Sequence, residues 1–157
     1  MWTGIVLLTA ITALYAGYNL LVKVSSNHVP ESATSTVLAT ICLQLAALAA
    51  SCTFAMLLLA RGGHVLKLSP AAFAWAAGAG LCIGLAEIGY FYLFRGVGGS
   101  GPVAANVAIP AIVTGTVVLT MFISFFALKE SIGGMQVAGT VVVIIGIAMI
   151  FSEGFRT

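Results

Sequence analysis

Residues 33–60 read ATSTVLATICLQLAALAASCTFAMLLLA, an apolar run that contains no charged side chain. A helix needs about 20 apolar residues to cross the hydrocarbon core of a bilayer, and this run exceeds that length. Similar runs lie on either side of it, separated by short polar or glycine-rich breaks such as SSNHVPES (25–32) and RGVGGSGP (95–102). The pattern predicts an all-α, polytopic membrane protein.

The predicted organisation is a single transmembrane domain over residues 1–157. Its five predicted helices cover about residues 2–22, 33–60, 71–94, 103–128 and 132–151. The N-terminal run lacks the basic start of a secretory signal and stays apolar for too long, so we expect a retained first helix. Serine or proline just ahead of the third and fifth runs is typical of a helix start.

Hydrophobic residues make up 61% of the chain and charged residues only 6%, whereas soluble domains carry roughly 25% charged residues. The lipid bilayer is therefore the expected solvent for most of the protein. The net charge of +2 is small and spread along the chain, so we expect no nucleic acid partner. The cysteines lie inside apolar runs and form no CxxC pair, which favours a packing role over a disulfide framework.

The positively charged residues divide evenly between the two faces of the predicted bundle. We call the face of the N-terminus side A and the opposite face side B. Three cations fall on each side: Arg61, Lys67 and Lys129 on side A, and Lys23, Arg95 and Arg156 on side B. The positive-inside rule orients a protein by the difference between its sides, so this tie allows insertion in both orientations and pairing with an inverted copy. The alternative is that the tie arises by chance and other signals fix the orientation.

Glu87 is the strongest candidate for a functional residue. It is the one acidic residue deep in a predicted span, roughly 10 Å from the side-B end of its helix. A carboxylate at that depth needs a cation or water, and otherwise it carries a proton, which is the behaviour that proton-coupled transport requires. The alternative is a structural ion pair with Lys23 or Arg95, which lie at the same end.

Other polar side chains lie at a similar depth in the side-B half of the bundle. The predicted substrate or ion site combines Glu87 with Tyr15, Asn19, Gln44, Tyr90 and Asn106. Tyr18 lies beside Asn19, and Thr36 and Thr40 share the helix face of Gln44. If these faces converge, they line a polar pocket that opens toward side B. Taken singly, each residue is also explained by a hydrogen bond between helices.

Proline and glycine positions predict features of the helices themselves. Pro110 should kink the fourth helix and free the carbonyl of Asn106. Such kinks border binding sites in many transporters, and they also occur in membrane helices without that role. Small residues at helical spacing predict close packing between helices at Gly80, Gly84, Gly139 and Gly146.

The sequence offers no support for catalysis. His28 and His64 fall in breaks on opposite faces of the predicted bundle, so they cannot share a metal ion. No nucleophile–base pair, phosphate-binding loop or haem-ligating histidine within a span is visible. We therefore expect a protein that is not an enzyme and that uses no cofactor and no metal.

Two adjoining stretches resemble a known family. GYFYLFRGVGGSGPVAANVAIPAIV (89–113) and FFALKESIGGMQVAGTVVVIIGIAMIF (125–151) resemble the second part of an EamA-type five-helix unit of the drug/metabolite transporter superfamily. The shared features, in the family's order, are Tyr90 and Tyr92, the small residues 98–101, Pro110, Glu130, and Gly139 with Gly146. Asn19 and Lys23 also match a polar residue and a lysine near the end of the family's first helix. The chain departs from the pattern at Lys129, where the family has glycine, and at Glu87, where an apolar residue is expected.

The resemblance spans essentially the whole chain and implies a function. Most EamA proteins carry two such units in inverted orientation, whereas this chain has one. The resemblance therefore implies a secondary transporter, an exporter of a small organic metabolite or drug-like solute. It would work as an antiparallel homodimer or with a related five-helix partner, as a multi-pass protein of a bacterial-type cytoplasmic (inner) membrane. The alternative is a non-transporting structural or accessory subunit of a larger membrane complex, and a membrane enzyme or lipid-handling protein is a third option.

Overall fold

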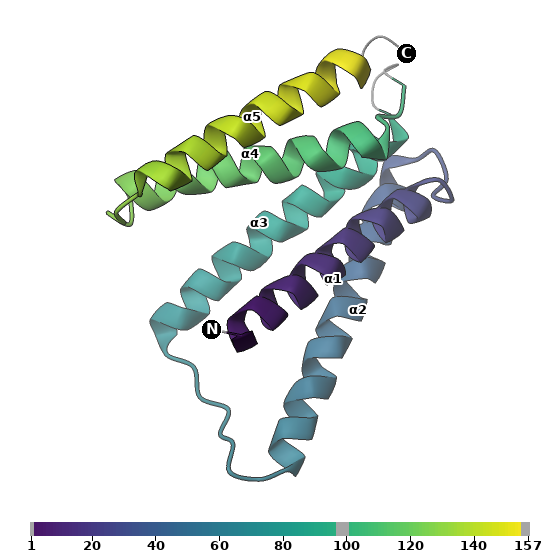
Figure 1. Cartoon of the computed structure of the whole chain (residues 1–157). Coiled ribbons are helices and arrows are strands. Elements are labelled where there is room, and N and C mark those ends of the chain that lie inside the picture. The colour runs from purple at the N-terminus through teal and green to yellow at the C-terminus, as the bar shows by residue number, and fades with distance from the viewer. Residues whose placement is uncertain (1, 97–100, 155–157) are drawn as a thin grey trace. The chain divides into compact units, whose positions relative to one another are not determined.

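The computed structural model of the chain describes residues 2–96 and 101–154, and within them it is all-α (Figure 1). The helices are α1 (Trp2–Ser26), α2 (Ala33–Ala60), α3 (Pro70–Arg95), α4 (Ala105–Phe126) and α5 (Gly134–Gly154). Each of the five is long and apolar enough to cross a membrane. The prediction of an all-α fold with five spans is confirmed, and the chain is a multi-pass membrane protein.

The ends of some helices differ from the ends of the apolar runs predicted from the sequence, because polar residues can also be helical. The first run was expected to end at Val22, but α1 continues to Ser26, whose hydroxyl donates a hydrogen bond to the carbonyl of Lys23 at 2.7 Å. Hydrophobicity marks the part of a helix that suits lipid, and a helix can continue beyond it. The fourth helix is shorter than expected, from Ala105 to Phe126.

Helix starts follow local hydrogen bonding. Ser32 caps α2, and Ser69 caps α3 by accepting from the backbone N–H of Ala72 at 3.2 Å, with Pro70 at the first helical position. This chemistry is as expected for α3. The start of α5 differs, because the helix begins at Gly134 and the side-chain oxygen of Gln136 accepts from the N–H of Gly133 at 2.7 Å.

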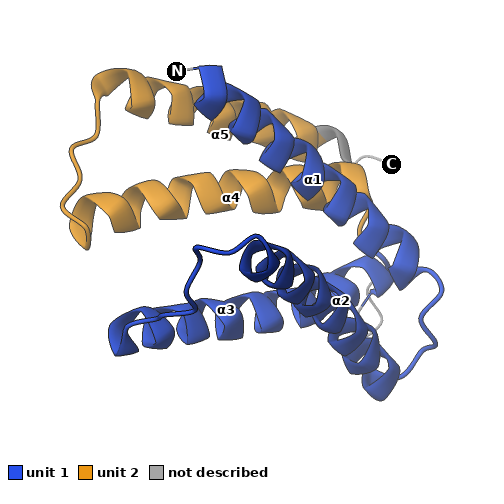
Figure 2. Cartoon of the chain, turned by 90° about the horizontal axis from the view of Figure 1, so that it is seen from below, with its two compact units in different colours: residues 1–102 blue, residues 103–157 orange. Residues whose placement is uncertain are grey.

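The chain divides into two compact units, Met1–Pro102 and Val103–Thr157 (Figure 2). Unit 1 contains α1, α2 and α3, and α3 packs against both of the others. Unit 2 is the hairpin of α4 and α5. The expectation of a single transmembrane domain over residues 1–157 stays a prediction.

The core of unit 1 lies at one end of its three helices. The buried side chains come from the last turns of α1, the first turns of α2 and the last turns of α3: Asn19, Val22, Ser26, Thr36, Thr40, Glu87, Phe91 and Phe94. The helices converge at this end and separate toward the other (Figure 1). At the separated end, residues 2–14 and 71–83 are all exposed. Lipid or further protein must cover these apolar surfaces, since water would not.

Candidate functional site

Glu87 lies in the core of unit 1, one turn before Phe91 on α3. Its side chain is 2% exposed, and its Oε2 is buried with no hydrogen-bond partner among the described residues. An unpartnered carboxylate among apolar side chains costs more free energy than almost any other buried group. A residue that costs this much and is still present is a candidate for binding a proton or a cation.

Tyr18 of α1 is a polar neighbour of Glu87. The Tyr18 hydroxyl and the Glu87 carboxyl approach each other. The Tyr18 hydroxyl is also buried, and among the described residues neither it nor Oε2 completes a hydrogen bond. Two facing polar groups, both without a completed bond, make a site that a ligand or a proton can satisfy.

Tyr18 was not among the site residues predicted from the sequence. The prediction followed the face of Tyr15, Asn19 and Lys23, which recur at a spacing of four. The buried face of α1 instead runs through Asn19, Val22 and Ser26, and Tyr18 lies one turn before Val22. The spacing of Tyr18 and Val22 is the signal that would have found it.

The two cations near Glu87 are held by other groups. Lys23 Nζ donates to the carbonyl of Phe94 at 3.1 Å and lies 5.3 Å from the centroid of that ring. Arg95 donates to the Thr36 hydroxyl and, at 3.4 Å, to the carbonyl of Ser32. Within the described part of the chain, neither cation forms an ion pair with Glu87. The ion pair considered from the sequence is therefore not what holds this carboxyl.

Asn19 and Gln44 belong to the same end of unit 1. Asn19 is 6% exposed and follows Tyr18 on α1. Gln44 of α2 is half-buried and lies against α3 at Gly84, where an added Cβ would meet its Nε2 at 3.0 Å. Gly84 is one turn before Glu87, so the missing side chain there makes room for Gln44 beside the turn that carries the carboxyl.

The tyrosines of the predicted site lie at its edge. Tyr15 is 61% exposed and meets the ring of Tyr18 edge-on, with centroids 6.4 Å apart. Tyr90 is half-buried, packs edge-on against Phe94 at 5.5 Å, and is close enough to Glu87 for an electrostatic interaction. Tyr90 therefore lies near the carboxyl, whereas Tyr15 contacts Tyr18 and is mostly exposed.

The remaining candidates fall elsewhere. Asn106 is exposed near the start of α4 and Pro110 lies inside that helix, so both belong to unit 2. An added Cβ at Gly80, Gly139 or Gly146 would meet no atom within 4 Å. Their role in helix packing, and the place of Asn106 in the site, stay predictions.

Thr36 and Thr40 are buried, but their hydroxyls are already used by α2 itself. Each donates to the carbonyl four residues earlier, to Ser32 and Thr36 respectively, at 3.1 Å. A hydroxyl that is hydrogen-bonded in this way costs little free energy to bury in a membrane helix. Their burial is therefore explained by packing, and Thr36 adds a hydrogen bond that holds Arg95.

An apolar groove of about 600 Å³ lies on unit 1 beside this cluster. Its walls come from α1 and α2, with one residue of α3, and include Leu14, Tyr18, Val22, Leu43, Ala46 and Phe91. Tyr18, whose hydroxyl approaches the Glu87 carboxyl, is one of the lining residues, whereas Glu87 itself does not line the groove. The volume is typical of pockets for small organic molecules, which run from roughly 300 to 1,000 Å³.

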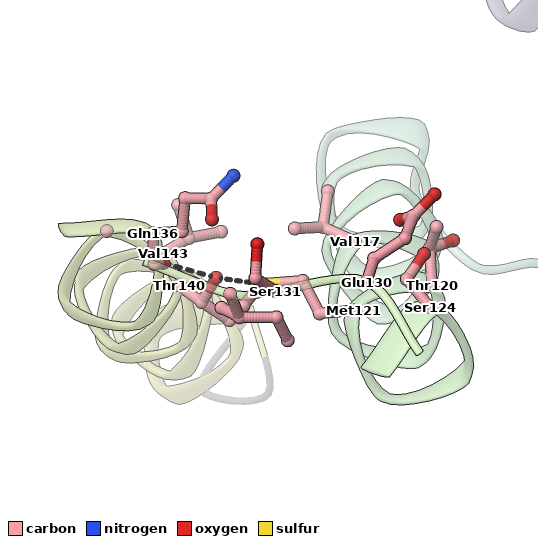
Figure 3. Close-up of a pocket in the computed structure, with 11 residues that line it drawn as sticks. Val117, Thr120, Met121, Ser124, Glu130, Ser131, Gln136, Thr140 and Val143 are labelled. Carbon is pink, nitrogen blue, oxygen red and sulfur yellow. Dashed lines mark hydrogen bonds between the residues drawn. The ribbon is translucent and has the colours of Figure 1, made fainter. Parts of the chain in front are cut away.

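A second groove, of about 420 Å³, lies between α4 and α5 in unit 2 (Figure 3). Its polar side chains are Thr120, Ser124, Glu130, Ser131, Gln136 and Thr140. Thr140 also donates a hydrogen bond to the sulfur of Met121, which joins the two helices. This groove was not predicted from the sequence. Two polar pairs at a spacing of four residues indicate it, Thr120 with Ser124 and Gln136 with Thr140.

Among the described residues, no three His, Cys, Asp or Glu side chains lie close enough together to bind a metal ion.

Comparison with known proteins gives no match to any family model, curated protein or solved structure. The resemblance to the EamA-type unit therefore depends on the sequence motifs alone. Within the described residues, the structure establishes a multi-pass membrane protein with a buried glutamate, Glu87, whose Oε2 has no hydrogen-bond partner.

Proposed function

We propose that the chain is a secondary transporter of a small organic solute, with Glu87 as the group that binds a proton or a cation. The observation that carries this proposal is the burial of the Glu87 side chain, whose Oε2 has no hydrogen-bond partner among the described residues. Lys23 and Arg95 are bonded to other groups, so a structural ion pair does not account for it. A group that must gain a proton or a cation to be stable is suited to coupling the movement of one to the movement of a solute.

The sequence motifs support the same function. The order and spacing of Pro110, Glu130, Gly139 and Gly146 resemble the EamA-type unit, and the proposed direction, export, comes from that resemblance. Transport moves the solute without converting it, so the proposal includes no enzymatic step, no cofactor and no metal. The proposed location is a bacterial-type cytoplasmic membrane.

We propose a dimer of five-helix units as the working form. The even division of Lys and Arg between the two predicted faces allows two copies to insert in opposite orientations. Inverted units of this kind give alternating access by rocking against each other around a site near the middle of the membrane. An antiparallel homodimer is the simplest such assembly, and a related five-helix partner is the other.

Proton-coupled flux in liposomes tests the proposal. The full chain is reconstituted with a pH-sensitive dye inside, a pH gradient is imposed, and a panel of organic solutes is added in turn. At least one solute should release the gradient faster than in protein-free liposomes. The Glu87→Gln variant should reduce this release to the background, because an amide neither gains nor loses a proton.

The matched control is Glu31→Gln, the same chemical change at an exposed residue between α1 and α2. It should leave the release rate unchanged. Equal release by the wild-type and Glu87→Gln proteins, both monodisperse in size-exclusion chromatography, would remove Glu87 from the mechanism. No release with any solute would count against transport itself.

A second candidate function is a non-transporting accessory subunit of a larger complex. The exposed apolar surface at the separated end of α1 and α3 favours it, since a partner protein would cover that surface as well as lipid does. Purification in mild detergent distinguishes the two. A transporter should elute as copies of itself or with one related chain, whereas a subunit should co-purify with a fixed set of unrelated chains.

A further inference from the structure

We propose that the groove between α4 and α5 binds a phospholipid whose headgroup carries a primary ammonium, as phosphatidylethanolamine does. The groove lies within unit 2 and does not include Glu87, so the inference goes beyond the proposed function and does not depend on it. It rests on three features of the groove: polar side chains that are left unbonded, a carboxylate beside them, and a change from polar to apolar along the groove.

Two hydroxyls of the groove make no hydrogen bond within the described residues. A hydroxyl in a membrane helix commonly donates to the carbonyl four residues earlier, as Thr116 of α4 does to Ile112 at 2.8 Å. Thr120 and Ser124 follow on the same helix, and in the described part of the chain neither makes such a bond. Hydrocarbon offers a hydroxyl no partner, so these two favour a bound polar group.

The unbonded groups of the groove match a phosphoethanolamine headgroup. Figure 3 shows Glu130 beside Thr120 and Ser124, so a carboxylate and two hydroxyls gather along α4. A primary ammonium brings one positive charge and three N–H donors, which suit these acceptors. Across the groove, Gln136 uses its Oε1 to accept from the N–H of Gly133. Its Nε2 can therefore donate to the phosphate oxygens next to the ammonium.

The groove changes from polar to apolar with distance from the turn. Glu130 and Ser131 lie in the turn between α4 and α5, which is at a membrane surface because both helices span the bilayer. Val117 and Val143 line the groove roughly 14 Å further along the two helices. An added Cβ at Gly139, which also lines it, would meet no atom within 4 Å. This open, apolar part suits an acyl chain that points toward the middle of the membrane.

The charges of the turn favour a zwitterionic headgroup with a primary ammonium. Lys129 and Glu130 are adjacent and exposed, so the turn carries one charge of each sign. Glu130 would repel the net negative headgroup of phosphatidylglycerol. Phosphatidylcholine is also a zwitterion, but its quaternary ammonium has no N–H to donate to the hydroxyls. A free amine has no apolar part to fill the inner groove.

Native mass spectrometry of the full chain in detergent, titrated with lipids of identical acyl chains, tests the inference. Phosphatidylethanolamine should bind saturably and about tenfold more tightly than phosphatidylcholine or phosphatidylglycerol, as expected from hydrogen bonds that involve a charged group. Free phosphoethanolamine, the headgroup without chains, should not bind over the same concentration range.

Two variants remove polar groups of the groove, each with a matched control. Glu130→Gln should weaken phosphatidylethanolamine binding about tenfold, because the charged partner of the ammonium is lost. Glu31→Gln, the same change at an exposed residue of unit 1, should have no effect. Thr120→Val removes one hydroxyl at nearly constant shape and should weaken binding about threefold. Thr116→Val should not, since that hydroxyl is bonded to Ile112 and lies outside the groove.

A third variant fills the groove and keeps its polar groups. Gly139→Leu places a side chain where the acyl chain would lie, and it should weaken phosphatidylethanolamine binding about tenfold or more, since an overfilled site excludes its ligand. Ala138→Leu is the control, at an exposed position of α5 that does not line the groove. It should leave the affinity unchanged.

Equal affinity for phosphatidylethanolamine and phosphatidylcholine would overturn the inference. So would phosphoethanolamine that binds as tightly as the whole lipid, which would make a soluble amine the ligand. Unchanged phosphatidylethanolamine affinity in Glu130→Gln or Gly139→Leu protein that remains monodisperse would have the same meaning. The measurement involves no flux and leaves Glu87 unaltered. A chain that releases a pH gradient but shows no preference for phosphatidylethanolamine therefore keeps the proposed function and loses this inference.

Discussion

Glu87 and Glu130 are the same residue type in two different settings. Glu87 is buried in the core of unit 1 and its Oε2 has no partner among the described residues. Glu130 is exposed in the turn between α4 and α5, where its backbone N–H donates to the carbonyl of Ser124 at 3.1 Å. The position of an acidic residue in a membrane protein therefore decides how much free energy its burial costs. A residue kept at a position where that free energy is high is the stronger candidate for a functional role.

The same contrast extends to the neighbours. Near Glu87 lie Tyr18, whose buried hydroxyl approaches the carboxyl, and Tyr90, yet Oε2 completes no hydrogen bond among the described residues. The groove beside Glu130 holds hydroxyls and an amide, several of which bond within the hairpin, including Thr140 and Gln136 (Figure 3). These bonded polar groups in unit 2 therefore support local structure, whereas the polar group at the centre of unit 1 does not.

Reversing the charge of each glutamate should give the largest difference in protein stability between the two positions. Glu87→Lys places a third positive charge beside Lys23 and Arg95, in the core, and should destabilise unit 1 by about 3–5 kcal/mol, the usual cost of an uncompensated buried charge. Glu130→Lys should leave stability unchanged because the side chain is exposed. Thermal unfolding followed by size-exclusion chromatography measures both, and equal melting temperatures would contradict the burial of Glu87.

Two glycines sharpen the comparison between the units. Gly84→Leu should destabilise unit 1 by about 1–3 kcal/mol through overpacking, because an added Cβ already meets Gln44 Nε2 at 3.0 Å. Gly139→Leu meets no atom within 4 Å and should not destabilise the hairpin. The same unfolding assay decides between them. If Gly139→Leu instead changes the oligomeric state, the predicted packing role of Gly139 lies between chains.

The smallest expected effect concerns the turn of unit 2. Lys129 has a φ of 55°, in the left-handed region that glycine adopts without strain. Lys129→Gly should raise the stability of the hairpin by about 1 kcal/mol, the cost of that backbone region for a residue with a Cβ. Lys129→Val should lower it, because a β-branched residue fits the region worst. A loss of stability on Lys129→Gly would mean that the lysine side chain contributes more than the backbone strain costs.

Lys129 is also a position where the chain differs from the family pattern that it resembles. The EamA-type pattern has glycine at this position, and the chain's departure from it is visible in the sequence. The structure adds that the backbone there is of the kind that favours glycine. The positive φ at Lys129 is a conformation that glycine would adopt without strain, although the residue here is lysine.

The sequence was least informative about which face of each helix packs against its neighbours. A face of Tyr15, Asn19 and Lys23 and a face of Tyr18 and Val22 are both consistent with the first apolar run. Only packing against α3 selects between them, and it buries Asn19 and Val22 while leaving Tyr15 exposed. A helix that is apolar all round carries little periodic signal, so its sequence does not say which side meets another helix.

The sequence alone determined that lipid surrounds this protein and that it has five spans, because ten charged residues and long apolar runs leave water no role as its solvent. It also pointed to Glu87, since a lone acidic residue in a span is costly wherever it faces. Only the tertiary structure decided that Glu87 is buried, that Lys23 and Arg95 are bonded to other groups, and that Tyr18 both adjoins the carboxyl and lines an apolar groove. The reason is physical: hydrophobicity is a property of each segment, whereas burial and pairing arise from contacts between residues far apart in the chain.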